Sequence, residues 1–160
     1  TKADAPALAL PKEAVEGCVL GACAAAGMAA ERIRVKREDI EHHGHTDAHA
    51  IVMMREDLKD EELVLRQSID ALGYVIKSAR AGVLPSFEVQ AAPVLGPRLM
   101  DTSNAVLHHA ALCSFVDVCE WCGEHAARYV PELTKALGKG MVGDDEDVRI
   151  INEAVSRVAL

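Results

Sequence analysis

Apolar residues recur along this chain with the spacing of an α-helix, and the pattern is clearest after Ser103. Between Ser103 and Gly123 neither Pro nor Gly interrupts the sequence. Four apolar residues there are spaced i, i+3, i+7 and i+10: Leu112, Phe115, Cys119 and Cys122. Residues with this spacing share one helical face, and Gly123 is a natural helix end. The pattern predicts one long helix.

A shorter helix and another long helix are predicted to follow. The shorter one covers Ala126–Leu137 and carries Pro131 early, where proline is tolerated. A glycine-rich loop at 138–143 then leads to an acidic segment, 144–147, which suits the positive end of a helix dipole. The last helix repeats the apolar spacing at Val148, Ile151, Val155 and Val158. Together these segments predict a helical hairpin that recurs.

The first half of the chain predicts two more long helices with a charged segment between them. Pro11 can open the first helix, which either continues or restarts after a kink near Gly27. Its apolar positions include Val15, Val19, Ala22, Ala26 and Ala29. The following segment, Glu38–Asp47, is charged, rich in histidine and broken by Gly44. We expect this segment to be a linker.

The strongest apolar stripe lies in the helix predicted for Glu61–Arg80. Its members are Leu65, Ile69, Leu72, Ile76 and Ala79. Gly82 is expected to end this helix at the position after its C-cap. A shorter helix with Pro85 near its start then carries Phe87, and two later prolines, Pro93 and Pro97, are expected to disturb it.

These helices recur at a nearly constant interval. Val64, Val106 and Val148 mark the openings of three long helices and are 42 residues apart. Periods of about 40–47 residues with two helices per unit are typical of HEAT and armadillo arrays. The pattern favours an all-α superhelix, a HEAT-repeat solenoid of about three to four hairpins, over a closed bundle. The expected divisions are a lead-in (1–10), a hairpin with the charged linker (11–55), two repeats (58–100 and 103–140) and the first helix of another repeat (144–160).

The composition agrees with a helical fold and limits the kinds of partner that the chain is expected to bind. Apolar residues make up 50% of the chain and aromatic residues 3%, which suits helix–helix packing. The net charge of −8 argues against nucleic acid, because phosphate binding needs a basic face. No signal peptide or apolar run of membrane-spanning length is evident, so no membrane partner is expected. The chain does not begin with Met, and we expect it to be a piece of a longer protein.

Two clusters of Cys and His residues could in principle bind a metal ion, and each has a simpler structural interpretation. The first, Cys119-Glu120-Trp121-Cys122 with His125, has no second Cys or His pair for a structural zinc site. Its cysteines also belong to the apolar stripe, which favours buried, reduced thiols. The second comprises His42, His43, His45 and His49 around Gly44, and a solvated loop is the favoured interpretation. Phosphate-loop, dinucleotide and hydrolase motifs are absent from the sequence. We therefore expect neither a cofactor nor an enzyme.

Several strings resemble importin-β-type nuclear transport receptors, and most closely the importin-β3 branch. They occur in the family's order: Arg34-Val35-Lys36-Arg37-Glu38-Asp39, the acidic 56–62 segment, Val83-Leu84-Pro85-Ser86-Phe87-Glu88, Cys113-Ser114-Phe115-Val116-Asp117-Val118-Cys119-Glu120, and Asp147-Val148-Arg149 with Ala154. The resemblance spans roughly 32–160. It implies a fragment of a HEAT array from a receptor that shuttles between cytoplasm and nucleus, contacts FG nucleoporins, and releases cargo when Ran·GTP binds.

The acidic segment is the candidate binding site. Its residues are Glu56, Asp57, Asp60, Glu61 and Glu62. They could meet cargo with basic signals through charge-assisted contacts, or they could simply be the start of a helix and a solvated linker. Two other functions remain open for the chain. One is a stand-alone helical protein that binds metal or undergoes thiol redox chemistry, and the other is a HEAT scaffold of another pathway.

Overall fold

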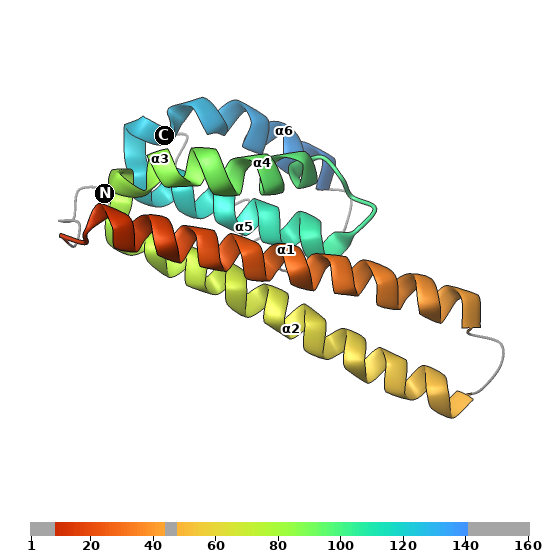
Figure 1. The fold of residues 1–160 in the computed structure, drawn as a ribbon. Helices are drawn as coiled ribbons and strands as arrows, with labels where there is room; N and C mark the ends of the chain where they lie inside the picture. Colours follow the sequence, from red (N-terminus) through yellow and green to blue (C-terminus); the bar gives the residue numbers. More distant parts are fainter. Residues whose placement is uncertain (1–8, 44–47, 141–160) are drawn as a thin grey trace.

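The computed structural model describes residues 9–43 and 48–140, and these form an all-α structure without strands (Figure 1). The predicted fold class is confirmed at this level. The elements in chain order are α1 (Lys12–His43), α2 (Ala48–Ala79), η2 (Arg80–Val83), α3 (Leu84–Ser86), η3 (Phe87–Ala91), α4 (Ala92–Leu95), η4 (Gly96–Leu99), α5 (Ala105–Cys122), η5 (Gly123–Tyr129) and α6 (Val130–Gly140). The segment predicted for 144–160, with Val148, lies outside the described residues.

The long helices α1 and α2 form an antiparallel hairpin (Figure 1). Each has 32 residues and is therefore about 48 Å long. Both contribute a stripe of buried apolar residues: Val15, Val19, Ala26, Ala29 and Ile33 in α1, and Leu65, Ile69, Leu72 and Ile76 in α2. The ends of α1 and α2 nearest their connection project beyond the other helices. We call this projecting part, residues 32–43 and 48–62, the arm.

Helix α1 runs through Gly27 without a break, so of the two alternatives that the sequence left open the structure shows the continuous helix. The structure corrects two boundaries in α2. First, α2 begins at Ala48 and not at Glu61, because partly buried residues extend its stripe backwards: Ile51, Met54 and Leu58. Second, Val64 consequently lies in the middle of α2 and does not open a helix. The first six residues of the charged segment, Glu38–His43, thus belong to α1, so the segment is less of a linker than expected.

Helix α1 also contradicts the expectation that no segment has membrane-spanning length. Over Lys12–His42 it contains an 18-residue window with mean hydropathy 1.3, of which 28% is buried. Its many alanines raise the mean hydropathy without forming an obvious apolar run. By length and composition alone α1 could cross a membrane, although core helices of soluble proteins meet the same criterion.

The short helix after α2 is irregular, as its prolines predicted. Residues 84–99 pass from α-helix to a π-helical turn, back to α-helix and then to a 3₁₀ turn. Proline lacks an N–H group and its ring clashes with the carbonyl four residues earlier. The π-helical turn ends at Ala91, just before Pro93, and the 3₁₀ turn contains Pro97. We call residues 84–99 the irregular helix.

The helices form two rows. One row consists of α2 and α5, which contact each other. The other row consists of α1, the irregular helix and α6: α1 contacts α3 and η3 of the irregular helix, and η4 of the irregular helix contacts α6. The hairpins α1–α2 and α5–η5–α6 join the rows. Each helix therefore packs beside the next but one in sequence, and Figure 1 shows the irregular helix between α1 and α6.

The junctions after α2 and α5 are alike. These helices end at Ala79 and Cys122, 43 residues apart, and the next residues have positive φ: 54° at Arg80 and 59° at Gly123. A 3₁₀ turn and a helix with an early proline follow each. The ends of α2 and α5 thus lie 43 residues apart, whereas the predicted 42-residue interval between helix openings does not hold for Val64.

The left-handed position after α2 is held by Arg80, so the prediction that Gly82 fills it is wrong. A side chain in this region costs roughly 1–2 kcal/mol. The Arg80 guanidinium lies 4.5 Å from the centroid of the Trp121 ring on α5. This cation–π contact offsets part of the cost.

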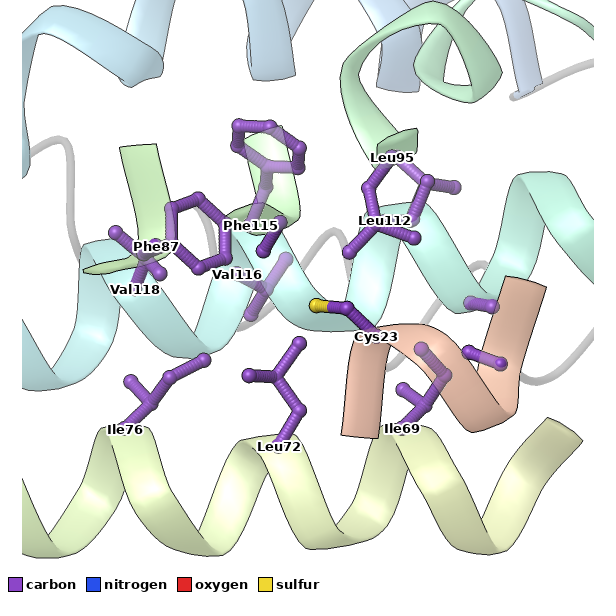
Figure 2. Packing of buried hydrophobic residues seen from close by; sticks show 14 of the residues in the cluster. Cys23, Ile69, Leu72, Ile76, Phe87, Leu95, Leu112, Phe115, Val116 and Val118 are labelled. Carbon is purple, nitrogen blue, oxygen red and sulfur yellow. The ribbon is translucent and has the colours of Figure 1, made fainter. Parts of the chain in front are cut away.

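One apolar cluster joins all these helices. Figure 2 shows Ile69, Leu72 and Ile76 of α2 directed toward residues of α1, α5 and the irregular helix. At its centre three aromatic rings meet edge to face, with centroids 5.3–6.0 Å apart: Phe87, Phe115 and Tyr129. The α5 residues predicted to share a face, including Cys119 and Cys122, lie in this core as expected.

Candidate functional site

The predicted acidic residues lie on α2, within the arm, and three of them pair with α1. Glu61 Oε2 is 2.7 Å from Arg32 Nε, Asp57 Oδ2 is 3.4 Å from Lys36 Nζ, and Glu62 Oε1 is 3.0 Å from a terminal guanidinium nitrogen of Arg37. These contacts link the two helices of the arm. Most of the negative charge that the sequence suggested for a partner is therefore used within the chain.

The other two acidic residues, Glu56 and Asp60, are exposed. They are four residues apart and so lie on the same side of α2. Among the residues that the structure describes, neither reaches a basic partner within ion-pair distance. Of the five candidates, these two are the ones that a partner could approach.

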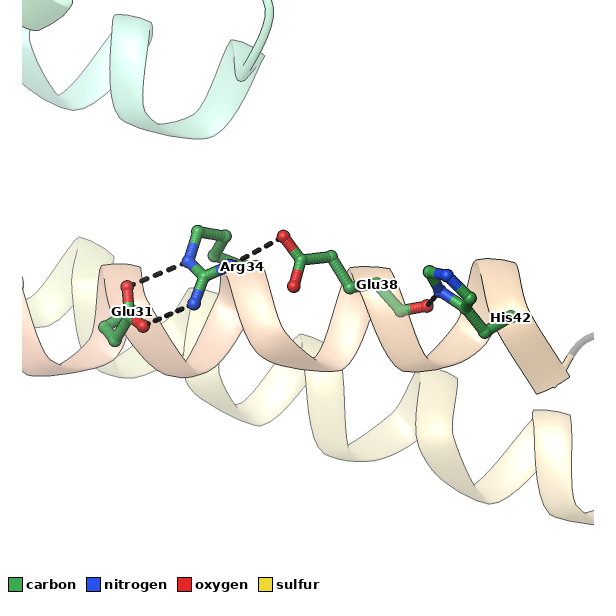
Figure 3. Close-up of polar contacts among 4 residues, drawn as sticks. All are labelled: Glu31, Arg34, Glu38 and His42. Atoms are coloured by element: carbon green, nitrogen blue, oxygen red, sulfur yellow. Dashed lines mark hydrogen bonds and ion pairs between the residues drawn. The ribbon is translucent and has the colours of Figure 1, made fainter.

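The outer surface of α1 carries its own charge network (Figure 3). Arg34 donates two hydrogen bonds to Glu31, at 3.0 and 2.6 Å, and one to Glu38 at 2.6 Å. The hydrogen bonds from Arg34 lower the pKa of the Glu31 carboxyl. The ring Nδ1 of His42 lies 2.7 Å from the backbone carbonyl of Glu38. Charges on this face are thus largely satisfied by one another.

The histidine cluster is not assembled into a site in the described structure. His42 and His49 are exposed on different helices, whereas the His43 side chain and His45 lie outside the described residues. Among the residues that the structure describes, no group of three or more His, Cys, Asp or Glu side chains is placed so that it could hold a metal ion.

The two thiols of the Cys119–Cys122 motif are buried. Burial raises the pKa of Cys119 to about 11 and, together with the neighbouring Cys119, that of Cys122 to about 12. A thiol must ionise to act as a nucleophile or metal ligand. Because their pKa values are this high, both thiols remain protonated at neutral pH. This agrees with the prediction that they are buried residues of the apolar core.

These raised pKa values predict a loss of stability at alkaline pH. The unfolded chain ionises its thiols near pH 8.5–9, whereas the folded chain holds their protons until about pH 11–12. Stability is therefore intact below pH 8.5 and falls above it, by up to about 1.4 kcal/mol per thiol per pH unit. Urea unfolding at pH 8 and 10 measures the loss. A Cys119→Ala/Cys122→Ala variant should lose less over this interval, and an equal loss would contradict the assignment.

A second surface, which sequence reasoning missed, lies between α2 and α5. Gly73 permits a close approach there, since a Cβ atom at that position would be 2.6 Å from an Asp117 carboxylate oxygen. The adjoining groove of about 400 Å³ has both aromatic and charged walls: Asp70, Tyr74, Lys77, Asp117, Glu120 and Trp121. Lys77 Nζ is 5.2 Å from the centroid of the Trp121 ring. The polar i, i+4, i+7 spacing of Asp70, Tyr74 and Lys77 was the available signal.

Comparisons with known proteins do not identify the chain. No family model, curated protein or solved structure matches it.

Proposed function

We propose that the chain is part of a HEAT-repeat scaffold of the importin-β type, a non-catalytic receptor that moves protein cargo between cytoplasm and nucleus. In this proposal the complete receptor binds cargo with basic signals, passes FG nucleoporins, and releases cargo when Ran·GTP binds. The observation that carries it is the 43-residue recurrence of one junction: a long helix, a residue of positive φ, a 3₁₀ turn and a proline-bearing helix.

The packing supports the same proposal. In a helical solenoid each helix pair packs mainly against the neighbouring pairs, and two rows of contacts follow from that rule. Exposed large apolar side chains gather on α1 and α2, where another pair of helices could cover them: Leu20, Met28, Val35, Val52, Met53, Leu63, Val64 and Tyr74. In this proposal α1 and α2 form one layer of the solenoid, and a further pair of helices packs against their exposed apolar side chains.

The proposed mechanism is a shift in the curvature of the array. Neighbouring layers meet over modest interfaces, so small rotations add along the superhelix. A ligand shifts such an equilibrium only by binding one curvature more tightly than another. Cargo and Ran·GTP would then oppose each other because they favour different curvatures.

Basic cargo would meet this segment at Glu56 and Asp60. Neutralising both by Glu56→Gln and Asp60→Asn should weaken binding of a Lys/Arg-rich peptide roughly two- to thirtyfold at low salt, since exposed ion pairs contribute about 0.2–1 kcal/mol each. Fluorescence anisotropy with a labelled peptide measures the change. Higher salt should reduce the difference between variant and parent.

A matched control removes the same charge elsewhere. Glu124→Gln with Glu132→Gln neutralises two exposed acids outside the arm, and we expect a smaller effect on the peptide. Glu62→Gln should act mainly on the hairpin, because Glu62 pairs with Arg37. Equal peptide affinity in the arm variant and this control would reject the assigned contacts.

The transport proposal is tested with the full-length natural protein. Cargo with a basic signal should bind it, and Ran·GTP, but not Ran·GDP, should displace that cargo in a pull-down. Direct binding of FG peptides provides the second measurement. If Ran·GTP does not displace the cargo and FG peptides do not bind, the result would indicate a HEAT scaffold of another pathway.

A further inference from the structure

A cysteine and a histidine face each other on α5, away from the acidic arm. Cys113 Sγ lies 3.4 Å from His109 Nε2, one helical turn earlier, and both residues are half-buried. The thiol donates this hydrogen bond and Nε2 accepts it in the imidazole tautomer that carries its hydrogen on Nδ1. An imidazole nitrogen placed beside a thiol can take its proton and leave a nucleophilic thiolate.

Both side chains line a cavity of about 320 Å³ between α2 and α5. Its walls are partly apolar, with Leu65, Ile69 and Val106 among them, and Arg66 and Asp70 supply its charged groups. A small, mostly apolar molecule with one polar group matches this lining. The cavity gives such a molecule access to the sulfur of Cys113.

The other cysteines lack this combination of features. Cys23, Cys119 and Cys122 are buried, and burial raises the pKa of each thiol. Cys18 is exposed on α1 and lines neither this cavity nor the groove beside Trp121. Within the described structure, Cys113 combines partial exposure, a neighbouring imidazole and a cavity.

We propose that Cys113 is a modification site for small soft electrophiles of the α,β-unsaturated carbonyl class, with His109 as its base. The thiol proton moves to His109 Nε2, and a sulfur electron pair forms a bond to the β-carbon. The C=C π pair moves to give an enolate, which takes the proton back from the imidazolium. The net reaction adds S–H across the double bond and requires no oxidant or reductant.

The adduct would occupy the cavity between α2 and α5. Since these helices are neighbours in one row, a group attached to Cys113 would contact Leu65 and Ile69 and alter the packing of α2 against α5. This proposal does not depend on the transport function, because it uses only the chemistry of the cavity.

The test measures alkylation of the native chain by acrylamide at pH 7, with each cysteine quantified by peptide mass spectrometry. We expect Cys113 to react at least about fivefold faster than Cys18, and His109→Gln to slow Cys113 by about tenfold while leaving Cys18 unchanged. Equal rates at Cys113 and Cys18 in the native chain, or an unchanged Cys113 rate in the variant, would overturn the proposal.

Cys119 and Cys122 report whether the variant is folded, because they should react only after unfolding. If Cys119 and Cys122 become reactive in the His109→Gln variant, the role of His109 is tested instead by the pH dependence of Cys113 alkylation in the parent chain. The Cys113 rate should rise less steeply than that of Cys18 between pH 7 and 8, since the imidazole of His109 already assists removal of the thiol proton. Parallel profiles would then reject the role of His109.

Discussion

Replacing Phe87 by Ala is expected to lower the free energy of unfolding by about 3–5 kcal/mol. Phe87 is 0% exposed, and its ring meets those of Phe115 and Tyr129 edge to face, with centroids 5.3 and 6.0 Å away. Removing it leaves a cavity where the irregular helix, α5 and η5 converge. Urea unfolding followed by circular dichroism measures the loss.

Two substitutions control for this result. Phe87→Leu keeps much of the volume, so it should cost less than the alanine variant. Val89→Ala lies in the same π-helical turn, but Val89 is 76% exposed, and a change within about 0.5 kcal/mol is expected. If Phe87→Ala and Val89→Ala were equally stable, the aromatic cluster would not be the centre of the core.

Replacing Gly27 by Pro and by Ala should change the free energy of unfolding in opposite directions. Proline there is expected to cost about 3 kcal/mol or more, because α1 is continuous and the ring would break a helical hydrogen bond. Alanine should stabilise the chain by about 0.5–1 kcal/mol. A Cβ atom at Gly27 would meet no atom within 4 Å, so alanine adds helix propensity without a clash.

The same unfolding measurement, with helix content from circular dichroism, decides this prediction. Gly17→Ala provides a parallel case, since a Cβ atom there also meets open space. A kinked α1, as the sequence allowed, would tolerate Gly27→Pro with little loss. That outcome would contradict the continuous helix.

Much of the fold followed from local pattern. The stripe from Leu65 to Ala79, the face of Leu112 and Phe115, and the end of α5 at Gly123 were predicted correctly. These features depend on helical periodicity and on backbone freedom, which neighbouring residues largely determine. The boundary at Glu61 failed for a related reason, because charged residues on the arm masked an apolar stripe that continues to Ile51.

The candidate site was less predictable. A run of five acidic residues is visible in sequence, yet nothing local indicates that Asp57, Glu61 and Glu62 face basic residues of α1. That pairing joins positions 21–29 residues apart. The groove at Trp121 and the cavity at Cys113 were missed for the same reason, since each needs residues from both α2 and α5.

The sequence by itself determined that the chain is helical, which faces of its helices are apolar, and that Cys119 and Cys122 belong to the core. Periodicity and composition are sufficient for these features because each acts within a few turns of one helix. Only the tertiary structure decided which charges remain exposed, why Arg80 adopts a left-handed backbone, and that Cys113 opens into a cavity. Those outcomes depend on how α1, α2 and α5 approach one another, and that approach is fixed by packing between distant segments.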